Sequence, residues 1–265
     1  MNERLVEMMK VQELFNLEGK VAVVTGGSSG LGEQASVALA EAGASVGVVA
    51  RKVERCESTA ERLRSVGVKA IAVKCDVSKP ADIDAMVESV LKEFGRIDIL
   101  VNSAGVTWGA PAEDYPLERW QQILNVNVTG TFLCCQKVSR VMIGQRYGKI
   151  INLASIASFR GAEPEVMDAV GYQTSKGAVA IMTRDLAAKW ARYGINVNAI
   201  APGWFRTHMT RSFLEIKGEM VLKHIPLRRF GGEEDLKGAV VFLASEASRY
   251  VTGHVLCVDG GYLCI

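Results

Sequence analysis

Extended runs of one kind of residue are missing from this sequence. Nowhere do 18 apolar residues follow one another, so no segment predicts a membrane-spanning helix. Lysine and arginine number 31 against 29 aspartates and glutamates, which gives a net charge of +2 without a long run of either sign. This balance argues against nucleic acid or an anionic membrane as the main partner. Residues 1–4 begin no apolar signal-peptide core, so we expect a cytoplasmic protein.

Clusters of metal-ligand residues are also missing. No Cys-x-x-Cys pair occurs, and His208, His224 and His254 have no ligand-like spacing to one another, so we expect no metal site. We expect the cysteines to be small buried hydrophobic residues of a protein in a reducing compartment. There are six of them: Cys56, Cys75, Cys134, Cys135, Cys257 and Cys264.

Short apolar runs alternate with amphipathic stretches along the chain, which is typical of βαβ units and a parallel sheet. Strands are predicted at 21–24, 45–49, 70–73, 97–101, 150–153, 197–200 and 255–258. Helices are predicted at 31–42, 53–66, 82–94, 117–145, 175–193 and 233–245. The sequence therefore predicts an α/β fold, a single Rossmann-like, doubly wound parallel sheet of about seven strands flanked by helices.

No linker, repeat or low-complexity segment divides the 265 residues. We therefore expect one dinucleotide-binding and catalytic domain over 1–265, with 1–18 as an N-terminal extension. The extension has two interpretations. It forms an amphipathic helix with Leu5, Met8, Met9 and Val11 turned inward, or it is a loose terminus.

A glycine-rich loop follows the first predicted strand, and a helix follows the loop. Gly26, Gly30 and Gly32 have the spacing G-x-x-x-G-x-G, and Ser28 and Ser29 add hydroxyl groups. Glycine lets the backbone turn tightly and approach a diphosphate, while the helix N-terminus offers free N–H groups and the positive end of its dipole. The alternative is a turn that merely caps the helix.

Basic residues follow the second predicted strand. In NAD-preferring folds of this type an acidic residue there binds the ribose diol, whereas this chain has Arg51 and Lys52. A guanidinium and an ammonium suit a 2′-phosphate, so we predict NADP(H) over NAD(H). Asp76, after the third strand, either accepts a hydrogen bond from an adenine amino group or caps the turn at 78–80.

Tyr172 and Lys176 stand four residues apart at the head of a predicted helix, so their side chains share one face. A neighbouring ammonium favours the phenolate and should lower the tyrosine pKa toward the working range of a proton donor or acceptor. Ser155 follows a predicted strand, and its hydroxyl could hold a carbonyl oxygen while the tyrosine moves a proton.

Taken together, these motifs resemble the short-chain dehydrogenase/reductase superfamily from about residue 19 to 261, nearest to its gluconate-5-dehydrogenase-like and 3-oxoacyl-reductase-like members. The resemblance rests on the glycine loop, Asp76, Asn102-Ser103-Ala104-Gly105, Asn127, Ser155, Tyr172, Lys176, Pro202-Gly203 and Val258-Asp259-Gly260-Gly261, in this order.

The resemblance implies hydride transfer with a tetrad of Asn127, Ser155, Tyr172 and Lys176. Tyr172 would be the general acid of carbonyl reduction, Lys176 would hold the nicotinamide ribose, and Asn127 would hold a water that relays protons. The cofactor contacts that it implies, together with those already argued, are Gly26, Ser28, Ser29, Gly30, Leu31, Gly32, Arg51, Lys52, Asp76, Val77, Asn102, Ala104, Gly105, Tyr172, Lys176, Pro202, Gly203 and Thr207.

Three features depart from the family pattern. Ser103 replaces a common asparagine, and the spacing from Ser155 to Tyr172 is about four residues longer than usual. The extra residues lie in a loop at 160–168 that should rim the substrate pocket. The chain ends in the apolar tail 264–265, which often lies in a subunit interface in similar proteins.

The substrate stays open between a 3-oxoacyl thioester, whose carrier phosphates Arg206 or Arg211 could meet, and a keto-sugar acid such as 5-keto-gluconate. A hydrophobic or steroid-like ketone is a further alternative. The apolar segments 106–108 and 204–209 should contribute walls, and the acidic residues Glu163, Glu165 and Asp168 count mildly against an anion.

A different class of function is a nucleotide-binding scaffold without turnover, which the presence of the whole tetrad makes the weaker hypothesis. The family resemblance also implies a homodimer or homotetramer built on the two long helices at 117–145 and 175–193. In the second helix the apolar stripe comprises Val179, Met182, Leu186 and Trp190. The alternative is that these stripes cover only their own sheet.

Overall fold

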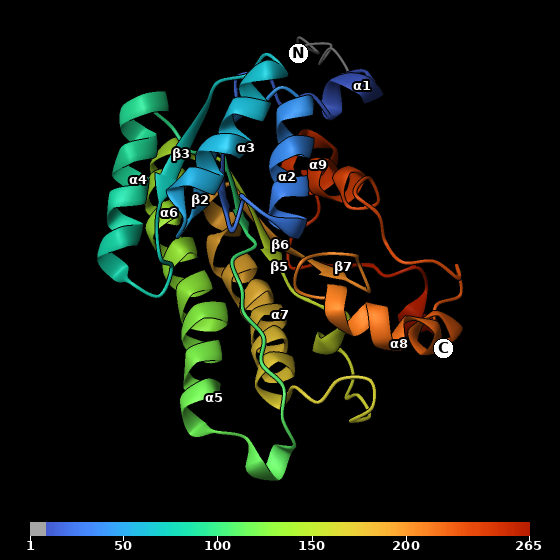
Figure 1. The fold of residues 1–265 in the computed structure, drawn as a ribbon. Helices are drawn as coiled ribbons and strands as arrows, with labels where there is room; N and C mark the ends of the chain where they lie inside the picture. The colour runs from blue at the N-terminus through green and yellow to red at the C-terminus, as the bar shows by residue number, and fades with distance from the viewer. Residues whose placement is uncertain (1–8) are drawn as a thin grey trace.

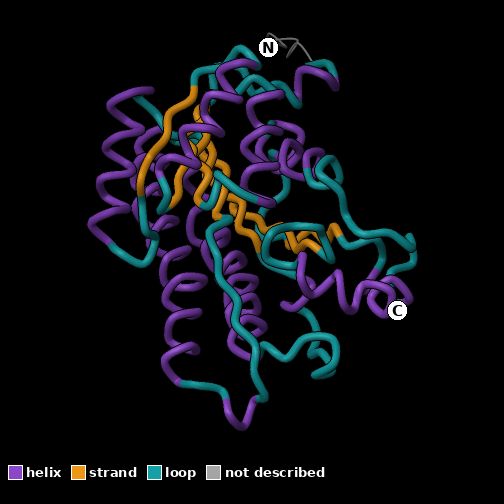
Figure 2. Tube along the Cα trace, viewed as in Figure 1, coloured by secondary structure: helices purple, strands orange, loops and turns teal. Residues whose placement is uncertain are grey.

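A parallel sheet forms the centre of the protein, whose computed structural model describes residues 9–265. Within that range seven strands are hydrogen-bonded in the order β3-β2-β1-β4-β5-β6-β7, all parallel (Figures 1 and 2). The strands are β1 Val21–Thr25, β2 Ser45–Ala50, β3 Ala70–Lys74, β4 Ile99–Asn102, β5 Gly148–Leu153, β6 Ile195–Pro202 and β7 Val255–Val258. The predicted doubly wound sheet is confirmed, and every predicted strand is present with its bounds shifted by two residues at most.

Alternate residues of each central strand point to opposite faces of the sheet, because side chains in a strand alternate with a period of two. Ala22 and Val24 of β1 belong to one core cluster, whereas Val21 and Val23 belong to another. All five residues of β1 are buried. Burial on both faces explains why the strands read as continuous apolar runs rather than as alternating ones.

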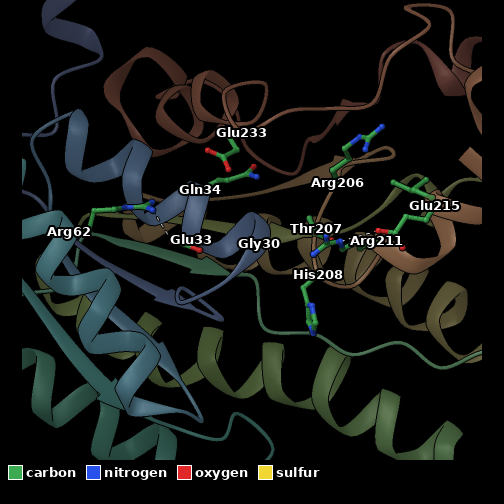
Figure 3. A pocket seen from close by; sticks show the side chains of 11 residues that line it. Gly30, Glu33, Gln34, Arg62, Arg206, Thr207, His208, Arg211, Glu215 and Glu233 are labelled. Carbon is green, nitrogen blue, oxygen red and sulfur yellow. Dashed lines mark hydrogen bonds and ion pairs between the residues drawn. The ribbon is translucent and has the colours of Figure 1, made fainter.

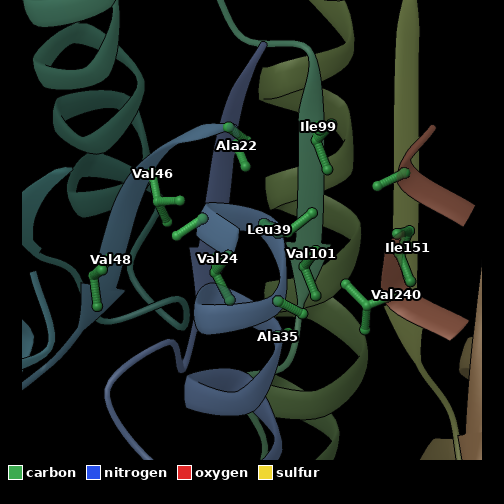
Figure 4. Close-up of a cluster of buried hydrophobic side chains, with 14 of the residues drawn as sticks. Ala22, Val24, Ala35, Leu39, Val46, Val48, Ile99, Val101, Ile151 and Val240 are labelled. Carbon is green, nitrogen blue, oxygen red and sulfur yellow. The ribbon is translucent and has the colours of Figure 1, made fainter. Parts of the chain in front are cut away.

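Helices α2 Gly30–Glu41, α3 Val53–Ser65 and α9 Lys237–Ala244 cover one face. Figure 4 shows the packing of this layer, where Ala35 and Leu39 of α2 and Val240 of α9 meet side chains from the strands. Small residues on α2 let the helix approach the sheet closely, and this close approach fixes the start of α2 at the carboxyl end of β1.

Helices α4 Pro80–Phe94, α6 Thr131–Gln145 and α7 Val170–Trp190 cover the opposite face (Figure 1). Leu186 of α7 and Val138 of α6 are buried in this second cluster, against Leu100 and Ile150 of the sheet. Of the predicted stripe on α7, Val179 and Leu186 are buried in core clusters of their own chain, and Met182 and Trp190 pack against those clusters. The stripe therefore covers its own sheet, which is the alternative that the sequence left open.

Four helical features differ from the sequence prediction. The long helix at 117–145 consists of α5 Leu117–Leu124, a π-helical segment Asn125–Gly130 and α6. Helix α7 begins five residues earlier than predicted, and α9 begins four residues later. Helix α8 Arg211–Lys223 was not predicted, because Gly218 and the 83%-exposed Ile216 weaken its periodicity.

The N-terminal extension is only partly covered by the structure. Of the residues expected to turn inward, Leu5 and Met8 lie outside the described range, and Met9 and Val11 are exposed at 47% and 65%. The prediction that Met9 and Val11 turn inward is therefore wrong. Helix α1 Val11–Leu14 has no buried residue, and the chain is held instead by Leu17, which is buried in the first core cluster.

The cysteines divide into two groups. Cys56, Cys75, Cys134 and Cys135 are buried as expected, but Cys257 and Cys264 are exposed, so the expectation of burial is wrong for these two. Cys257 lies on β7, the last strand of the sheet, where a neighbouring strand is present on one side only. No helix within residues 9–265 has the length and apolarity needed to cross a membrane.

Candidate active site

The carboxyl ends of the strands bring the predicted motifs to one edge of the sheet. The glycine loop follows β1, Asp76 follows β3, Asn102 ends β4, and Ser155 lies two residues beyond β5. Because the strand order reverses between β1 and β4, the loops that leave these two strands diverge to opposite faces and open a crevice. Ligands of doubly wound folds bind in this crevice, so the sheet order alone selects this edge as the candidate site.

The glycine loop is shaped by contacts that leave no space for side chains. Gly26 has a φ of +66°, and a Cβ atom there would lie 2.9 Å from the Cα of Ala104. A Cβ on Gly32 would overlap the carbonyl oxygen of Gly26 and lie 3.0 Å from the Oγ of Ser103. The start of α2 therefore packs directly on the loop, with its N-terminal N–H groups available to an anion. Ser103, the departure from the family pattern, fits this contact because it is small.

A cavity of about 160 Å³ lies beside the glycine loop, at the crevice between β1 and β4. Most of its lining was predicted to bind the cofactor: Gly26, Ser28, Ser29, Arg51, Asp76, Val77, Ala104 and Gly105. Val49, Ala50, Cys75, Val106 and Val126 complete the wall; of these only Val106 had been assigned from the sequence, and to the substrate pocket rather than to the cofactor. These extra residues are mostly apolar and suit the flat face of a base, which short apolar residues at strand ends could have indicated.

Arg51 and Lys52 are both exposed after β2, and Arg51 lines the cavity. Asp76 fulfils the capping alternative, since its Oδ1 accepts hydrogen bonds from the Ser78 backbone N–H at 3.0 Å and the Ser78 hydroxyl at 2.7 Å. Burial acts to raise the pKa of Asp76, but these hydrogen bonds and the charge of Arg51 outweigh burial and lower it. A charged Asp76 therefore stands opposite Arg51 in the cavity lining.

Tyr172 lies in the first turn of α7, next to Ser155 at the end of β5. Burial raises the pKa of Tyr172, and a hydrogen bond with the Ser155 side chain offsets part of that rise. This differs from the expectation that Lys176 lowers the tyrosine pKa, because loss of hydration disfavours the phenolate more than the neighbouring groups favour it. In this state the phenol keeps its proton and is suited to donate it.

Lys176 is buried one turn further along α7. Its Nζ donates a hydrogen bond to the carbonyl oxygen of Leu153 at 2.6 Å and lies 5.6 Å from the centroid of the Tyr172 ring. Burial lowers the pKa of Lys176 to about 8. The lysine is thus fixed between the end of β5 and the tyrosine, with a charge that is lost within the physiological range of pH.

Asn127 occupies the π-helical segment and is 1% exposed. Its amide closes a ring with the backbone of Val106, accepting from the N–H at 2.8 Å and donating to the carbonyl at 2.9 Å, and it donates to the Ser175 hydroxyl at 2.9 Å. The side chain therefore ties the loop after β4 to α7. A Cβ on Gly105 would lie 3.4 Å from Asn127 Oδ1 and 3.9 Å from Lys176 Nζ, so this loop closes over both groups.

Asn102, Pro202 and Gly203 were also predicted to contact the cofactor, but they do not line the cavity beside the glycine loop. Asn102 is buried with its amide donating to Asn152 Oδ1 at 2.9 Å and to Cys135 Sγ at 3.2 Å, which turns it away from the crevice. Gly203 donates its N–H to the carbonyl of Val258 at 2.9 Å. Pro202-Gly203 thus packs on the Val258-to-Gly261 segment.

A second cavity, of about 460 Å³, lies on the outer side of α2, between its first turns and residues 206–215 (Figure 3). Gly30 and Thr207 from the predicted cofactor set line it, whereas Leu31, Gly32, Lys52, Asn102, Tyr172, Lys176, Pro202 and Gly203 line neither cavity. Its charged residues largely neutralise one another, as in the pair Arg62–Glu33 at 3.0 Å.

A small cavity of about 20 Å³ is lined by residues that directly follow Ser155 and Tyr172 in the chain. The loop at 160–168 contributes to it, and Trp204 and Ile156 form further walls. That this loop rims the substrate pocket stays a prediction. Gln173 and Tyr262 also line this cavity, and the sequence analysis missed both. Gln173 could have been inferred from its position directly after Tyr172. Tyr262 could not, because only the tertiary fold brings it to this cavity. No cluster of His, Cys, Asp and Glu suited to a metal ion occurs in the part of the chain that the structure describes.

Comparisons with known proteins give relatives along almost the whole chain. Residues 26–263 match the family model described as Enoyl-(Acyl carrier protein) reductase. The chain is 41% identical over 252 residues to the 2-dehydro-3-deoxy-D-gluconate 5-dehydrogenase of Dickeya dadantii (strain 3937), covering 94% of this chain and 97% of the relative. It is 38% identical over 255 residues to the 5-keto-D-gluconate 5-reductase of Escherichia coli (strain K12), with coverage of 96% and 99%.

A solved structure agrees with these matches. The gluconate 5-dehydrogenase from Burkholderia cenocepacia J2315, crystallised in complex with NADP and tartrate, has a TM-score of 0.92 and 36% identity, covering 97% of this chain and 100% of that one. The fold, the cofactor crevice and the relatives agree that this chain is an oxidoreductase acting on CH–OH groups with a nicotinamide cofactor. The chain belongs to the short-chain dehydrogenase/reductase family.

Proposed function

We propose that this protein is an NADP(H)-dependent oxidoreductase that interconverts a keto-sugar acid, such as 5-keto-gluconate, and the corresponding secondary alcohol. The observation that carries the proposal is the juxtaposition of Ser155, Tyr172 and the buried Lys176 beside a crevice that suits a dinucleotide. The sugar-acid class is supported by the names of the two curated relatives and of the solved gluconate 5-dehydrogenase.

The proposed chemistry divides between the cofactor and the protein. A bound NADPH supplies the hydride that adds to the carbonyl carbon, leaving NADP⁺. The Ser155 hydroxyl holds the carbonyl oxygen, and the Tyr172 phenol donates its proton to that oxygen, which yields the alcohol. Lys176 stabilises the resulting phenolate by its charge. In the oxidative direction Tyr172 accepts the proton instead.

Asn127 helps to position the catalytic residues through its contacts with the loop after β4 and with α7. Its amide bonds to Val106 and Ser175, so the side chain acts as a clamp that holds the loop after β4 against α7. The water that the family resemblance places at Asn127, and the proton relay to Lys176, stay predictions.

Arg51 supports NADP(H) over NAD(H). Its side chain lines the crevice at the end of β2, where a 2′-phosphate of the adenosine ribose would meet it. Replacement by glutamine removes the positive charge and keeps most of the length. Because a hydrogen bond to a charged group contributes about 1.5–3 kcal/mol, we expect Arg51→Gln to weaken NADPH binding by roughly ten- to a hundredfold and to leave NADH binding unchanged. Fluorescence titration with both cofactors measures this difference.

A 3-oxoacyl thioester is the second candidate substrate, favoured by a curated relative named 3-oxoacyl-[acyl-carrier-protein] reductase that is 37% identical to this chain over 247 residues. The arginines expected to bind carrier phosphates are partly engaged elsewhere. Arg211 pairs with Glu215 at 3.1 Å, and the Arg206 guanidinium lies 5.2 Å from the centroid of the Phe230 ring. These contacts favour the sugar acid.

The direct test follows NADPH absorbance with matched concentrations of 5-keto-gluconate, a 3-oxoacyl thioester and a hydrophobic cyclic ketone. Turnover of the keto-acid with higher kcat/KM than of the other two is the expected result. Preference for the thioester would assign the protein to acyl reduction, and binding of NADPH with no turnover of any ketone would favour the scaffold hypothesis. The same assays performed on residues 1–265 also test the proposal that they act as one catalytic domain.

A further inference from the structure

Two buried nitrogen atoms near the proposed active site have no hydrogen-bond partner among residues 9–265. They are the indole Nε1 of Trp204 and the side-chain amide Nε2 of Gln173. A buried N–H donor left without a partner costs about 1–3 kcal/mol, so native proteins rarely keep one unless water or a ligand accepts from it. Neither residue was assigned to the tetrad or to cofactor binding.

Both donors line the same cavity, of about 20 Å³. Ile156 and Ala157 of this cavity directly follow Ser155, and Gln173 directly follows Tyr172. Ser155 and Tyr172 are not themselves among its lining residues, so the cavity lies next to the tetrad along the chain. A volume of this size holds one water-sized polar group, such as a single oxygen atom of a ligand.

The charge around the cavity is positive. Arg160 lines it, and its guanidinium lies over the Tyr262 ring at 5.4 Å from the centroid. Arg160 is itself exposed, and its Nε donates a long hydrogen bond, 3.4 Å, to the Gly161 carbonyl oxygen. No acidic side chain is among the described residues that line the cavity, so Glu163 and Glu165, which weighed against an anion in the sequence, do not line it.

The indole donor is held in place by its neighbours. The Trp204 ring stacks on Phe213 with centroids 5.2 Å apart and planes at 14°, and it meets the edge of Tyr262 at 6.5 Å and 73°. Trp204 is 7% exposed. A donor fixed in this way loses little conformational entropy on binding, which is the general condition for a specific polar subsite.

We propose that Arg160, Gln173 and Trp204 form the subsite that binds the carboxylate of the substrate. The two buried donors suit one carboxylate oxygen inside the cavity, and the exposed Arg160 guanidinium suits the other oxygen outside it. With the carbonyl held at Ser155 and the acid group held here, the substrate is bound at two points and its orientation is set. This inference rests on the proposed reduction of a keto-sugar acid and adds the residues that select the acid.

The test compares two ketones that differ only at the acid end. One is 5-keto-gluconate, and the other is the neutral ketohexose with a hydroxymethyl group in place of the carboxylate. We expect Trp204→Phe, Gln173→Leu and Arg160→Gln each to raise KM for the acid at least tenfold and KM for the neutral ketone less than threefold. Trp190→Phe, a tryptophan that packs in the second core cluster, is the matched control and should change neither.

Equal changes of KM on both ketones, or no change on either, would overturn the subsite. NADPH affinity, measured on every variant by fluorescence, separates loss of the subsite from loss of the fold. The wild-type protein tests the proposed function independently of the subsite. If the wild-type protein reduces no keto-sugar acid, that function is wrong, and calorimetric titration of gluconate into the NADPH-bound enzyme then decides the subsite. Gluconate binding that Trp204→Phe weakens supports it, and binding that is absent or unchanged refutes it.

Discussion

At the scale of single residues, burial determines the acid–base properties of the site. Lys176 is buried and Tyr172 is partly buried, and in each case burial disfavours the charged form. The pKa of the tyrosine rises and that of the lysine falls to about 8, so the pair holds a protonated phenol beside a lysine that titrates near neutrality. The sequence showed the two residues but not the solvation that sets their charges.

Tyr172→Phe removes the proton donor and nearly nothing else. Because a positioned acid or base contributes about 10²–10⁴-fold to rate, we expect kcat to fall by that order while NADPH affinity stays within threefold. Steady-state kinetics and fluorescence titration measure the two quantities. Tyr250→Phe, at a fully exposed tyrosine, is the control, and wild-type kcat in Tyr172→Phe would remove the phenol from the mechanism.

The pH dependence of ketone reduction should follow Lys176. The lysine is charged below its folded-state pKa of about 8 and becomes neutral as pH rises through that value, so the phenolate loses its stabilising charge. Since kcat/KM reports the pKa values of the free enzyme, we expect kcat/KM for reduction to be constant below pH 8 and to fall about tenfold per unit above it. Tyr172 keeps its proton throughout, because its own pKa is raised.

Lys176→Arg gives the matched test of this pH profile. A guanidinium stays charged across the range, so any residual activity of this variant should not fall near pH 8. A wild-type profile that stays flat to pH 10, or a variant that still falls at pH 8, would assign the titration to another group.

At the scale of elements, close backbone contacts hold the cofactor crevice in shape. The turn from β1 into α2 depends on Gly26 and Gly32, and the loop after β4 depends on the Asn127 clamp from the π-helical segment. π-helical segments are frequent at functional sites, because the extra residue changes which side chain faces inward. The contact of Gly26 with Ala104 and the Asn127 clamp join elements that are distant in the sequence.

Gly32→Ala tests the contact between α2 and the glycine loop. A methyl group there would overlap the carbonyl oxygen of Gly26, which cannot move without distorting the loop. We expect overpacking to lower the free energy of unfolding by about 1–3 kcal/mol and NADPH affinity to fall more than tenfold. Chemical denaturation and cofactor titration check both. Gly144→Ala, at a glycine of α6 with open space around its Cβ position, should change neither.

At the scale of the whole molecule, the outer surfaces of the long helices bear exposed apolar residues. Phe132 on α6 is 38% exposed and Ile181 on α7 is 60% exposed, while the stripe that the sequence singled out is buried within the chain. Exposed apolar side chains on neighbouring helices suit a subunit interface. They make Phe132 and Ile181 the residues to examine for the proposed dimer or tetramer.

Light scattering should give a multiple of the 28.7 kDa chain mass at micromolar concentration. Ile181→Arg places a charge in the proposed interface and should shift the mass toward the monomer, whereas Ile216→Arg, on the 83%-exposed residue of α8, should leave it unchanged. A monomeric wild type would contradict the oligomer, and a mass unaffected by Ile181→Arg would place the interface elsewhere.

The sequence by itself determined the alternation of strands and helices, the glycine turn and the spacing of Tyr172 and Lys176. These are local patterns, in which periodicity and residue type depend on neighbours within one or two turns. The family motifs extended this to most of the lining of the crevice, because the glycine loop, Asp76 and the segment 102–105 lie at the carboxyl ends of strands.

Only the tertiary structure decided what depends on burial and on contacts between distant segments. It showed that the α7 stripe faces the sheet, that two cysteines are exposed, and that burial opposes the expected fall in the Tyr172 pKa. It also brought Arg160, Gln173 and Trp204 to one cavity from three separate segments. Solvation and the meeting of remote side chains follow from how the chain packs as a whole, and no local pattern in the sequence encodes them.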